Sequence, residues 1–273
     1  MPSSYSSTAY SSTAFVALIP ARMASTRLPG KPLADLAGLP MVVRVAQRAQ
    51  ASGAQRVVVA TDSDDIVRAC QRHGIETVLT LDTHPTGTDR LSEAVEHLKL
   101  SEDTLVVNVQ GDEPLIPPEV IAAVAHELDR HPECQIATAA HALRDADECF
   151  NPDVVKVVTD ALGRALYFSR APIPWSRDQF QASPKALPPD GLWLRHVGLY
   201  AYRIPFLRQF PKLTRAPLET LEQLEQLRAL WHGNKIAVLQ LAQPLPPGVD
   251  SVQDLARMRA LVQQHNTHPG ETS

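Results

Sequence analysis

Three cations stand in one short loop near the start of the chain. Arg22, Arg27 and Lys31 follow an apolar run, Val16 to Ile19, and the loop closes on a Pro-Gly pair. The apolar run is typical of a strand, which we expect Pro20 to end. Small residues after such a strand let backbone N–H groups approach an anion. We therefore predict a site for a chain of phosphates, with an ordinary turn and solvated cations as the alternative.

Two common phosphate loops are excluded at this position. Lys31 is followed by Pro32, and the upstream glycine of the P-loop pattern G-x-x-x-x-G-K-[ST] is missing. The dinucleotide pattern G-x-G-x-x-G does not occur either. The cationic loop therefore belongs to neither class.

Two aspartates follow apolar segments that lie far apart in the chain. Asp112 comes two residues after a predicted strand, and Asp250 directly precedes the last predicted helix. Mg²⁺ prefers carboxylate oxygens, usually one or two of them together with substrate phosphates. Each aspartate also has a structural alternative. Asp112 could organise a turn, and Asp250 could cap the helix with Ser251 and Asp254, which the residues alone favour.

The second half of the chain holds further candidates for ligand binding. Arg170 and Arg177 flank a proline-rich stretch, where two guanidiniums would suit a planar carboxylate. Surface arginines beside a buried Trp175 are an equal alternative. His196 and Tyr200 are four residues apart on a predicted strand, so they share a face and could line a pocket.

One carboxylate falls on the apolar face of a predicted helix. The helix is expected over residues 217–231, and Glu225 there shares a face with Leu218 and Leu221. A carboxylate in such a place must be paired or functional. Arg228, three residues later, is the expected structural partner.

Short apolar strands alternate with helices through the first half. Such alternation indicates an α/β fold with a mostly parallel sheet and helices on both faces. The expected strands are 57–60, 75–79 and 104–110, and the expected helices are 41–49, 66–73, 91–98 and 117–128. Ligands of such sheets bind beyond the carboxyl ends of the strands, where three loops would converge. These loops are 20–31, 84–90 and 110–114.

The second half is more irregular, which indicates an inserted lobe or dimerisation arm at about 151–215 within a single domain, 14–265. The expected strands there are 154–158, 165–168, 196–202 and 236–241, and the last helix is 251–263. The polar ends, 1–13 and 266–273, are predicted to be disordered tails.

Composition narrows the class of protein. The 273 residues are 44% hydrophobic, with interspersed charges and a formal net charge of -4, so neither nucleic acid nor a membrane is an expected partner. The three cysteines, Cys70, Cys134 and Cys149, show no C-x-x-C spacing and are expected to be reduced thiols of a cytoplasmic protein. No apolar run approaches the length of about 18 residues that a membrane span needs. Residues 1–13 lack the features of a secretory signal.

Several of these stretches together resemble one family, the 3-deoxy-manno-octulosonate cytidylyltransferases, or CMP-Kdo synthetases. The resemblance runs from Phe15 to about Leu261. Its most specific pieces are IPARMASTRLPGKPL, VVATDSDD, NVQGDEPLIPP, NPDVVKVV, ALYFSRAPIPW, RHVGLYAYR, LEQLEQLRAL and GVDSVQDL.

The resemblance implies a Rossmann-like nucleotidyltransferase fold and a homodimer that uses Mg²⁺ to make CMP-Kdo and diphosphate from CTP and Kdo, for lipopolysaccharide. The implied catalytic residues are Arg22, Lys31, Asp112 and Asp250, of which Asp112 and Asp250 hold the metal. The implied CTP-binding residues are Ala21, Arg22, Lys31, Thr86, Gly87 and Gln110. The implied Kdo-binding residues are Arg170, Arg177, His196, Tyr200, Glu225 and Gln226.

One departure from the family touches the expected base pocket. The chain reads His84-Pro-Thr-Gly-Thr-Asp-Arg90 where the family reads closer to H-Q-S-G-T-E-R, so Pro85 replaces an amide side chain and an N–H.

Three alternative functions remain open. The closest is a cytidylyltransferase for another 2-keto sugar acid, such as sialic acid or 8-amino-Kdo. A sugar-1-phosphate nucleotidyltransferase and a non-catalytic nucleotide-binding module are more distant.

Overall fold

The computed structural model describes residues 13–24, 27–182, 187 and 193–267. Its contacts divide the chain into two compact units. We call Ala14–Ala122 with Leu245–Ser273 the terminal unit, and Ala123–Pro244 the central unit. The predicted lobe at about 151–215 falls inside the central unit. No helix in the described part of the chain is both long and apolar enough to cross a lipid bilayer.

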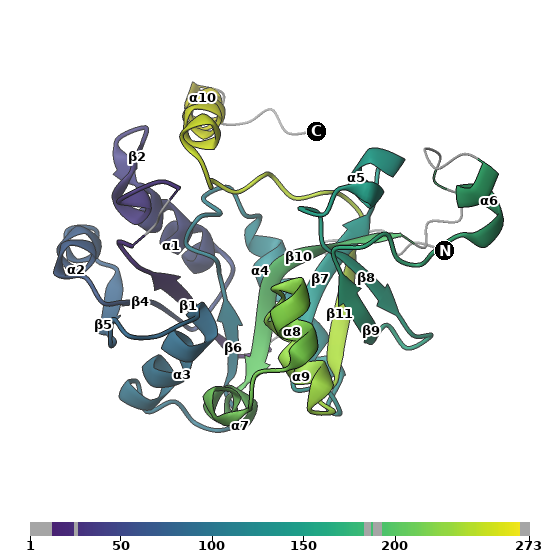
Figure 1. The fold of residues 1–273 in the computed structure, drawn as a ribbon. Coiled ribbons are helices and arrows are strands. Elements are labelled where there is room, and N and C mark those ends of the chain that lie inside the picture. The colour runs from purple at the N-terminus through teal and green to yellow at the C-terminus, as the bar shows by residue number, and fades with distance from the viewer. Residues whose placement is uncertain (1–12, 25–26, 183–186, 188–192, 268–273) are drawn as a thin grey trace. The chain divides into compact units, whose positions relative to one another are not determined.

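The terminal unit contains a parallel sheet in the order β6-β1-β4-β5. The strands are β1 (Phe15–Ala21), β4 (Arg56–Thr61), β5 (Glu76–Leu79) and β6 (Leu105–Asn108). Helices α1 (Met41–Ala51) and α2 (Asp64–Gln71) lie on one face, and α3 (Gly87–His97) lies on the other (Figure 1). The chain order turns back at β1, whose neighbours are β4 and β6. This is where the rule for open α/β sheets places a ligand.

Two element ends in this unit differ from the expectation. Strand β1 continues through Pro20 to Ala21, because Pro20 pairs in register with Ala60 of β4 while the ladder to β6 ends at Leu18. A proline without an N–H is tolerated where one side of a strand is unpaired. Helix α3 begins at Gly87 rather than Leu91, because the Thr86 side chain caps it.

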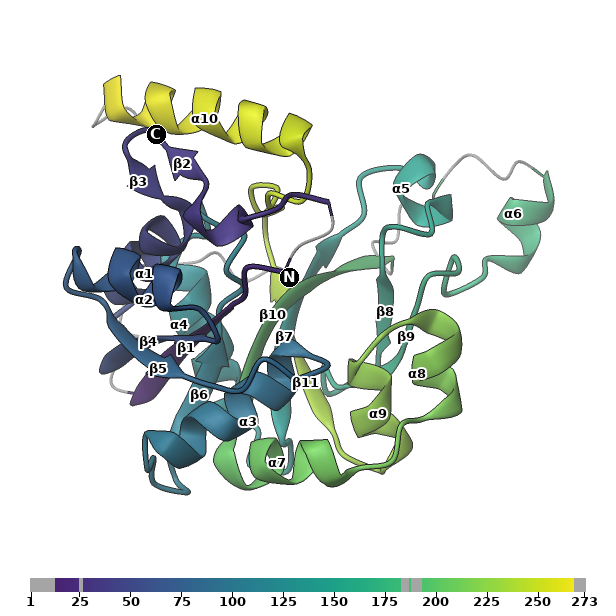
Figure 2. The same cartoon turned by 60° about the vertical axis from the view of Figure 1, so that its left-hand side comes forward.

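The last segment of the chain returns to the terminal unit. Helix α10 (Val252–Thr267) lies against the hairpin of β2 (Asp35–Leu36) and β3 (Leu39–Pro40), as Figure 2 shows. Arg259 Nε donates to Asp35 O at 2.9 Å. One apolar core joins both ends of the chain, and its buried members are Leu28, Leu36, Met41, Val249, Leu255, Met258 and Val262. Helix α10 continues past its predicted end at 263, and it includes residues 266 and 267, which were wrongly predicted to belong to the C-terminal tail. The predicted tail residues 1–12 and 268–273 lie outside the described residues.

The central unit holds a mixed sheet. Strand β7 (Ile136–Ala142) pairs parallel with β11 (Ile236–Leu241) and antiparallel with β10 (Leu194–Arg203). The hairpin β8 (Lys156–Thr159) and β9 (Ala165–Ser169) joins through β10. Helix α4 (Pro118–Arg130) carries the boundary between the units. The remaining helices are α5 (Ala146–Phe150), α6 (Arg177–Ala182), α7 (Ile204–Gln209), α8 (Pro217–Glu222) and α9 (Gln226–Trp231).

The single helix expected over 217–231 is wrong. Gln223 adopts a left-handed conformation, φ 52°, which ends α8 and turns the chain before α9 starts (Figure 1). Leu221 is 80% exposed, so it marks no buried face. The expected pair of Glu225 with Arg228 stays a prediction. Arg228 makes a two-pronged ion pair with buried Glu219, at 2.9 and 2.6 Å.

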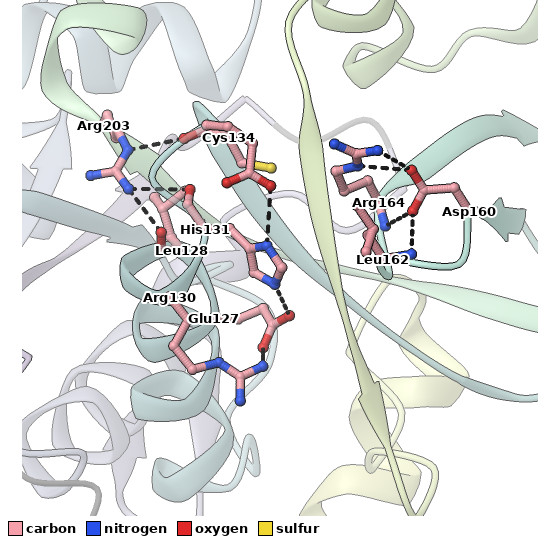
Figure 3. A network of polar contacts seen from close by, with 10 residues as sticks. Glu127, Leu128, Arg130, His131, Cys134, Asp160, Leu162, Arg164 and Arg203 are labelled. Atoms are coloured by element: carbon pink, nitrogen blue, oxygen red, sulfur yellow. Dashed lines mark hydrogen bonds and ion pairs between the residues drawn. The ribbon is translucent and has the colours of Figure 1, made fainter.

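The carboxyl end of α4 is held by one arginine of β10. Arg203 donates to three backbone carbonyls, those of Leu128 and Cys134 at 2.9 Å and that of His131 at 3.3 Å (Figure 3). The last carbonyls of a helix have no partner within the helix, so a cation there satisfies them. Arg203 therefore fixes the turn that leads from α4 into β7.

Beside this turn, three side chains of metal-binding type lie close together. The ligand atoms of His131, Glu133 and Cys134 are all within 4.8 Å of one another. His131 faces Glu127 at 3.2 Å and Glu133 at 3.4 Å (Figure 3). Burial, and then Glu133, raise the pKa of the Cys134 thiol to about 11. The contacts with Glu127 and Glu133 therefore explain the position of the His131 imidazole.

Candidate active site

A cavity of about 370 Å³ opens in the terminal unit beyond the carboxyl ends of β1 and β6. Its walls come from all three loops that were expected to converge. Every residue predicted to bind CTP or the metal lines it, namely Ala21, Arg22, Lys31, Thr86, Gly87, Gln110, Asp112 and Asp250. Seven other described residues line the cavity and were not predicted to bind CTP or the metal, among them Arg27, His84, Arg90 and Gly111. Of these, Arg27 carried a signal as the third cation of the loop.

Lys31 joins the two aspartates of this cavity. Its Nζ donates to Asp112 Oδ2 at 2.7 Å, to Asp250 Oδ1 at 3.1 Å and to Val249 O at 3.0 Å. Burial alone would lower the pKa of Lys31, but Asp112 and Asp250 outweigh it and the pKa is raised. Lys31 is therefore a fixed cation at the position where a phosphate chain was expected.

The structural alternative for Asp250 is resolved by its neighbours. Ser251 Oγ accepts from Asp254 N at 3.1 Å, and Asp254 Oδ2 accepts from Ser251 N at 3.0 Å, which forms a reciprocal capping box. The Asp250 carboxylate makes a different set of contacts, with Lys31 and with Arg27 at 3.2 Å. Ser251 and Asp254 thus cap α10, and the Asp250 carboxylate lines the cavity.

The two carboxylates form a donor set that suits Mg²⁺. Both reach one point, the Lys31 ammonium, and hard divalent cations take such oxygens together with substrate phosphates. Glu113 stands beside them, and burial, followed by the charges of Asp112 and Asp250, raises its pKa to about 7. The residues present therefore fit the metal that the family resemblance implied.

Helix α3 points its first turn at the cavity. Thr86 and Gly87 line it, and a helix N-terminus favours an anion. The Thr86 hydroxyl donates to Asp89 Oδ2 at 2.6 Å and accepts from Asp89 N at 3.1 Å. Arg90 is buried and pairs with Asp62 at 2.5 Å. These contacts fix the start of the helix, so the N-terminus of α3 has a defined direction before a ligand arrives.

Gly111 allows two strand ends to meet under the cavity. A Cβ atom at this residue would lie 2.9 Å from Pro20 O, a backbone atom, which is closer than real Cβ atoms come. The glycine is thus required by the close approach of the loop after β6 to the end of β1. Sequence alone gave no reason to single it out.

Gly111→Ala is expected to lower the free energy of unfolding by about 1–3 kcal/mol, the usual range for overpacking. It should also raise the KM for CTP, because the added methyl pushes the two cavity loops apart. Urea unfolding and steady-state kinetics measure both effects. Gly198→Ala, where a Cβ atom meets nothing within 4 Å, is the stability control. Equal stability losses in both variants would contradict the close-approach explanation.

The residues predicted to bind the sugar acid all lie in the central unit. Arg170 follows β9 and donates through Nε to Glu222 O at 2.8 Å and through a terminal nitrogen to Pro152 O at 2.9 Å. Arg177 is the first residue of α6, and its side chain is exposed. Among the described contacts, none places Arg177 beside Arg170 or the other predicted residues. The proline-rich loop that follows α6 lies mostly outside the described residues.

His196 and Tyr200 lie on one face of β10, as their spacing predicts. Their ring centroids are 5.5 Å apart, and Phe168 contacts His196 at 5.0 Å. An irregularity between Val197 and Tyr200 adds two residues to β10, so the alternation of faces is preserved. Thr138, which the sequence did not signal, lies 3.0 Å from His196 Nε2 and positions the ring.

His196 is expected to stay neutral at every physiological pH. Burial lowers its pKa to about 3, because the charged imidazolium is disfavoured away from water. In an NMR titration of the folded enzyme, its ring resonances should therefore not move between about pH 5 and 8. A midpoint for His196 inside that window would contradict the burial argument.

Glu225 and Gln226 begin α9. Glu225 acts on Tyr200: burial first, then Tyr202 and Glu225, raise the Tyr200 pKa well above its usual range. Gln226 is 8% exposed, and among the described residues its Nε2 has no hydrogen-bond acceptor. A buried amide donor left unpaired is costly unless a ligand satisfies it. His196, Tyr200 and Glu225 are thus brought together, and Gln226, the next residue in the chain after Glu225, has a buried amide donor without a described acceptor.

Comparison with known proteins bears directly on this arrangement. The family model described as Cytidylyltransferase matches residues 16–236. The chain belongs to the cytidylyltransferase family. It is a nucleotidyltransferase, and its predicted Rossmann-like α/β fold is confirmed. A solved CMP:2-keto-3-deoxy-manno-octonic acid synthetase in complex with CTP is 38% identical, with a TM-score of 0.83, over 93% of this chain and 100% of that one.

A second solved cytidylyltransferase, from Leptospira borgpetersenii serovar Hardjo-bovis, is more distant. It is 15% identical, with a TM-score of 0.56, over 95% of this chain and 98% of that one. This likeness supports the fold alone.

Proposed function

We propose that this cytidylyltransferase transfers CMP from CTP to Kdo and releases diphosphate. The observation that carries the proposal is the convergence of Lys31, Asp112 and Asp250 in one cavity of the terminal unit. The 38% identical synthetase with bound CTP supports the nucleotide and the sugar acid. In the reaction the C2 hydroxyl of Kdo attacks the α-phosphorus of CTP in line, and the bond to the leaving diphosphate breaks.

The residues of the nucleotide cavity act by charge and position. Arg22, Arg27 and Lys31 would neutralise the triphosphate, and the N-terminus of α3 would add the partial positive charge of its helix dipole without reorganisation. Phosphoryl-type transfers need no covalent enzyme intermediate, so positioning and charge stabilisation are the main work. Ala21 and Gln110 complete the proposed contacts to CTP.

Asp112 and Asp250 would hold Mg²⁺. The bound ion would supply charge neutralisation of the phosphates and acidification of a nearby hydroxyl. The carboxylates themselves orient Lys31, since both accept from its ammonium.

The central unit would bind the sugar acid. Arg170 and Arg177 would take its carboxylate, and Gln226 would donate to one of its hydroxyls. His196 and Tyr200 present neutral groups, because burial disfavours the charged form of each. Neutral donors and acceptors suit sugar hydroxyls, which carry no charge. Glu225 completes the proposed set.

We further infer a homodimer that acts in the cytoplasm and supplies lipopolysaccharide synthesis. Large exposed apolar side chains in the central unit support an interface between copies, namely Leu162, Leu166, Leu221 and Trp231. Three buried free cysteines suit a reducing compartment. Light scattering coupled to gel filtration measures the oligomeric state, and a monomer at micromolar concentration would remove the dimer.

The decisive experiment measures diphosphate release from CTP and Mg²⁺ with Kdo, with sialic acid and with neither. Release that depends on Kdo alone is the expected result. Release with another sugar acid only would keep the chemistry and discard the substrate. No release with any acid, together with measurable CTP binding, would leave only a nucleotide-binding module.

A further inference from the structure

Lys156 on β8 is a fully buried cation that the proposed reaction does not use. Its side chain is 0% exposed, and its Nζ donates to three backbone carbonyls. These belong to Asn151 at 2.9 Å, Val154 at 2.5 Å and Arg170 at 2.6 Å. An ammonium has three N–H donors, so three carbonyls satisfy it completely.

This set of bonds requires the charged form of the lysine. Burial lowers the pKa of Lys156, while Cys149 and Glu222 oppose that shift. A neutral amine would offer only two donors and leave one of the three carbonyls unpaired. A buried ion is stable only when fully hydrogen-bonded, so the three carbonyls are held in a defined arrangement around it.

Glu222 at the end of α8 holds Arg170, whose carbonyl Lys156 also binds, from another direction. Its Oε1 accepts from Ser169 Oγ at 2.6 Å, and its Oε2 accepts from Arg170 N at 2.9 Å. Its backbone carbonyl accepts from Arg170 Nε at 2.8 Å. Three separate segments therefore meet at one arginine: the loop 151–154, the end of β9 and the end of α8.

Hydrogen bonds hold the Arg170 guanidinium in place, in addition to those that hold its backbone. Of its five N–H donors, one goes to Glu222 O and one to Pro152 O. Pro152 lies between Asn151 and Val154, whose carbonyls Lys156 holds. Lys156 thus fixes the loop that in turn aims the guanidinium.

We propose that Lys156 and Glu222 are positioning residues that set the Arg170 guanidinium in place before the sugar acid binds. The inference rests on the proposed function, in which Arg170 takes the carboxylate of Kdo. A flexible arginine would have to lose side-chain entropy on binding, whereas a preset one does not. Neither residue needs to contact the substrate.

The test compares two variants that each remove one cation from three backbone carbonyls of the central unit. Lys156→Met removes the clamp on Arg170, and Arg203→Met removes the clamp on Leu128, His131 and Cys134. Both are expected to lower thermal stability. Only Lys156→Met should raise the KM for Kdo, by about tenfold or more, because it misplaces Arg170, which is proposed to bind Kdo. The KM of this variant for CTP should stay within about twofold, because Arg170 is not proposed to bind CTP.

Glu222→Gln is the second test, because its side chain is only partly buried and the protein is expected to fold. It should raise the KM for Kdo by at least about threefold, again without a change for CTP. An unchanged KM for Kdo in Glu222→Gln, or equal KM values in Lys156→Met and Arg203→Met, would overturn the positioning role. Wild-type enzyme that turns over no Kdo would instead refute the proposed function.

Discussion

Asp250→Asn is expected to lower kcat by at least about 100-fold, the scale on which one major electrostatic contact to a transition state acts. The change keeps the shape of the side chain and removes the charge that meets Lys31 and Arg27. Asp112→Asn should have the same effect, because its carboxylate accepts from the same ammonium at 2.7 Å. Steady-state kinetics at saturating CTP, Kdo and Mg²⁺ measures the loss.

The chain supplies a matched control four residues later. Asp254 also stands at the start of α10, but its carboxylate accepts from Ser251 N and Asp250 N. Asp254→Asn should therefore leave kcat within about twofold and lower the free energy of unfolding by about 1 kcal/mol, as loss of a cap does. Near-normal turnover in Asp250→Asn would remove that carboxylate from the catalytic machinery. A large loss of kcat in Asp254→Asn would show that helix geometry, not charge, explains both.

Glu219→Gln is expected to lower the free energy of unfolding by about 3–5 kcal/mol, the usual result of breaking a buried ion pair. Glu219 is 2% exposed and meets Arg228 through two bonds, while the Arg228 guanidinium lies 4.3 Å from the Phe210 ring centroid. Removing the carboxylate charge weakens the two charged bonds that the buried guanidinium makes with Glu219. Urea unfolding measures the effect.

Two further variants test whether burial of the ion pair is the reason for the stability loss in Glu219→Gln. Asp160→Asn breaks a more exposed pair with Arg164 and should lower the free energy of unfolding much less than Glu219→Gln does, because solvent screens exposed charges. The double variant Glu219→Leu with Arg228→Met should recover much of the loss, since an apolar pair leaves no buried charge. A loss in the double variant equal to the sum of both single losses would contradict this explanation.

The same pair predicts how stability depends on pH. Burial alone would raise the pKa of Glu219, but Arg228, the Ala216 N–H and Arg215 outweigh it and the pKa is lowered. A lowered folded pKa gives stability that is present above the unfolded pKa of about 4.3 and is lost as the pH falls through the folded value. The stability gap between wild type and Glu219→Gln should therefore close only in acid.

The nucleotide cavity was largely predictable because strand ends carry it. Apolar runs locate parallel strands, parallel strands end at one edge, and the loops there hold the chemistry. The Lys31–Asp112 and Lys31–Asp250 contacts span 81 and 219 positions of sequence, so pairing itself could not be read from spacing. The topology predicted that these side chains lie at one edge of the sheet, but only the packed structure shows that Lys31 contacts both aspartates.

The elements that the sequence did not predict correctly also have specific physical causes. Strand β7 reads Ile-Ala-Thr-Ala-Ala-His-Ala, and alanine is poor in strands, so no strand signal stood there. The break between α8 and α9 rests on Gln223 in a left-handed conformation, which glutamine seldom adopts. Leu218, Leu221 and Glu225 keep helical spacing across it, and the pattern therefore predicted one helix. Tertiary contacts of Glu219 and Arg228 override that pattern.

The return of residues 245–267 to the terminal unit has a consequence for how the enzyme is made. Val249 N donates to Asp112 O at 2.9 Å, and Asp250 lines the same cavity as Arg22. A ribosome that has completed the strands β1 to β6 has therefore not yet made Asp250, which lines this cavity. We expect nascent chains and products truncated before Leu245 to lack activity with CTP, because Asp250 is missing from them.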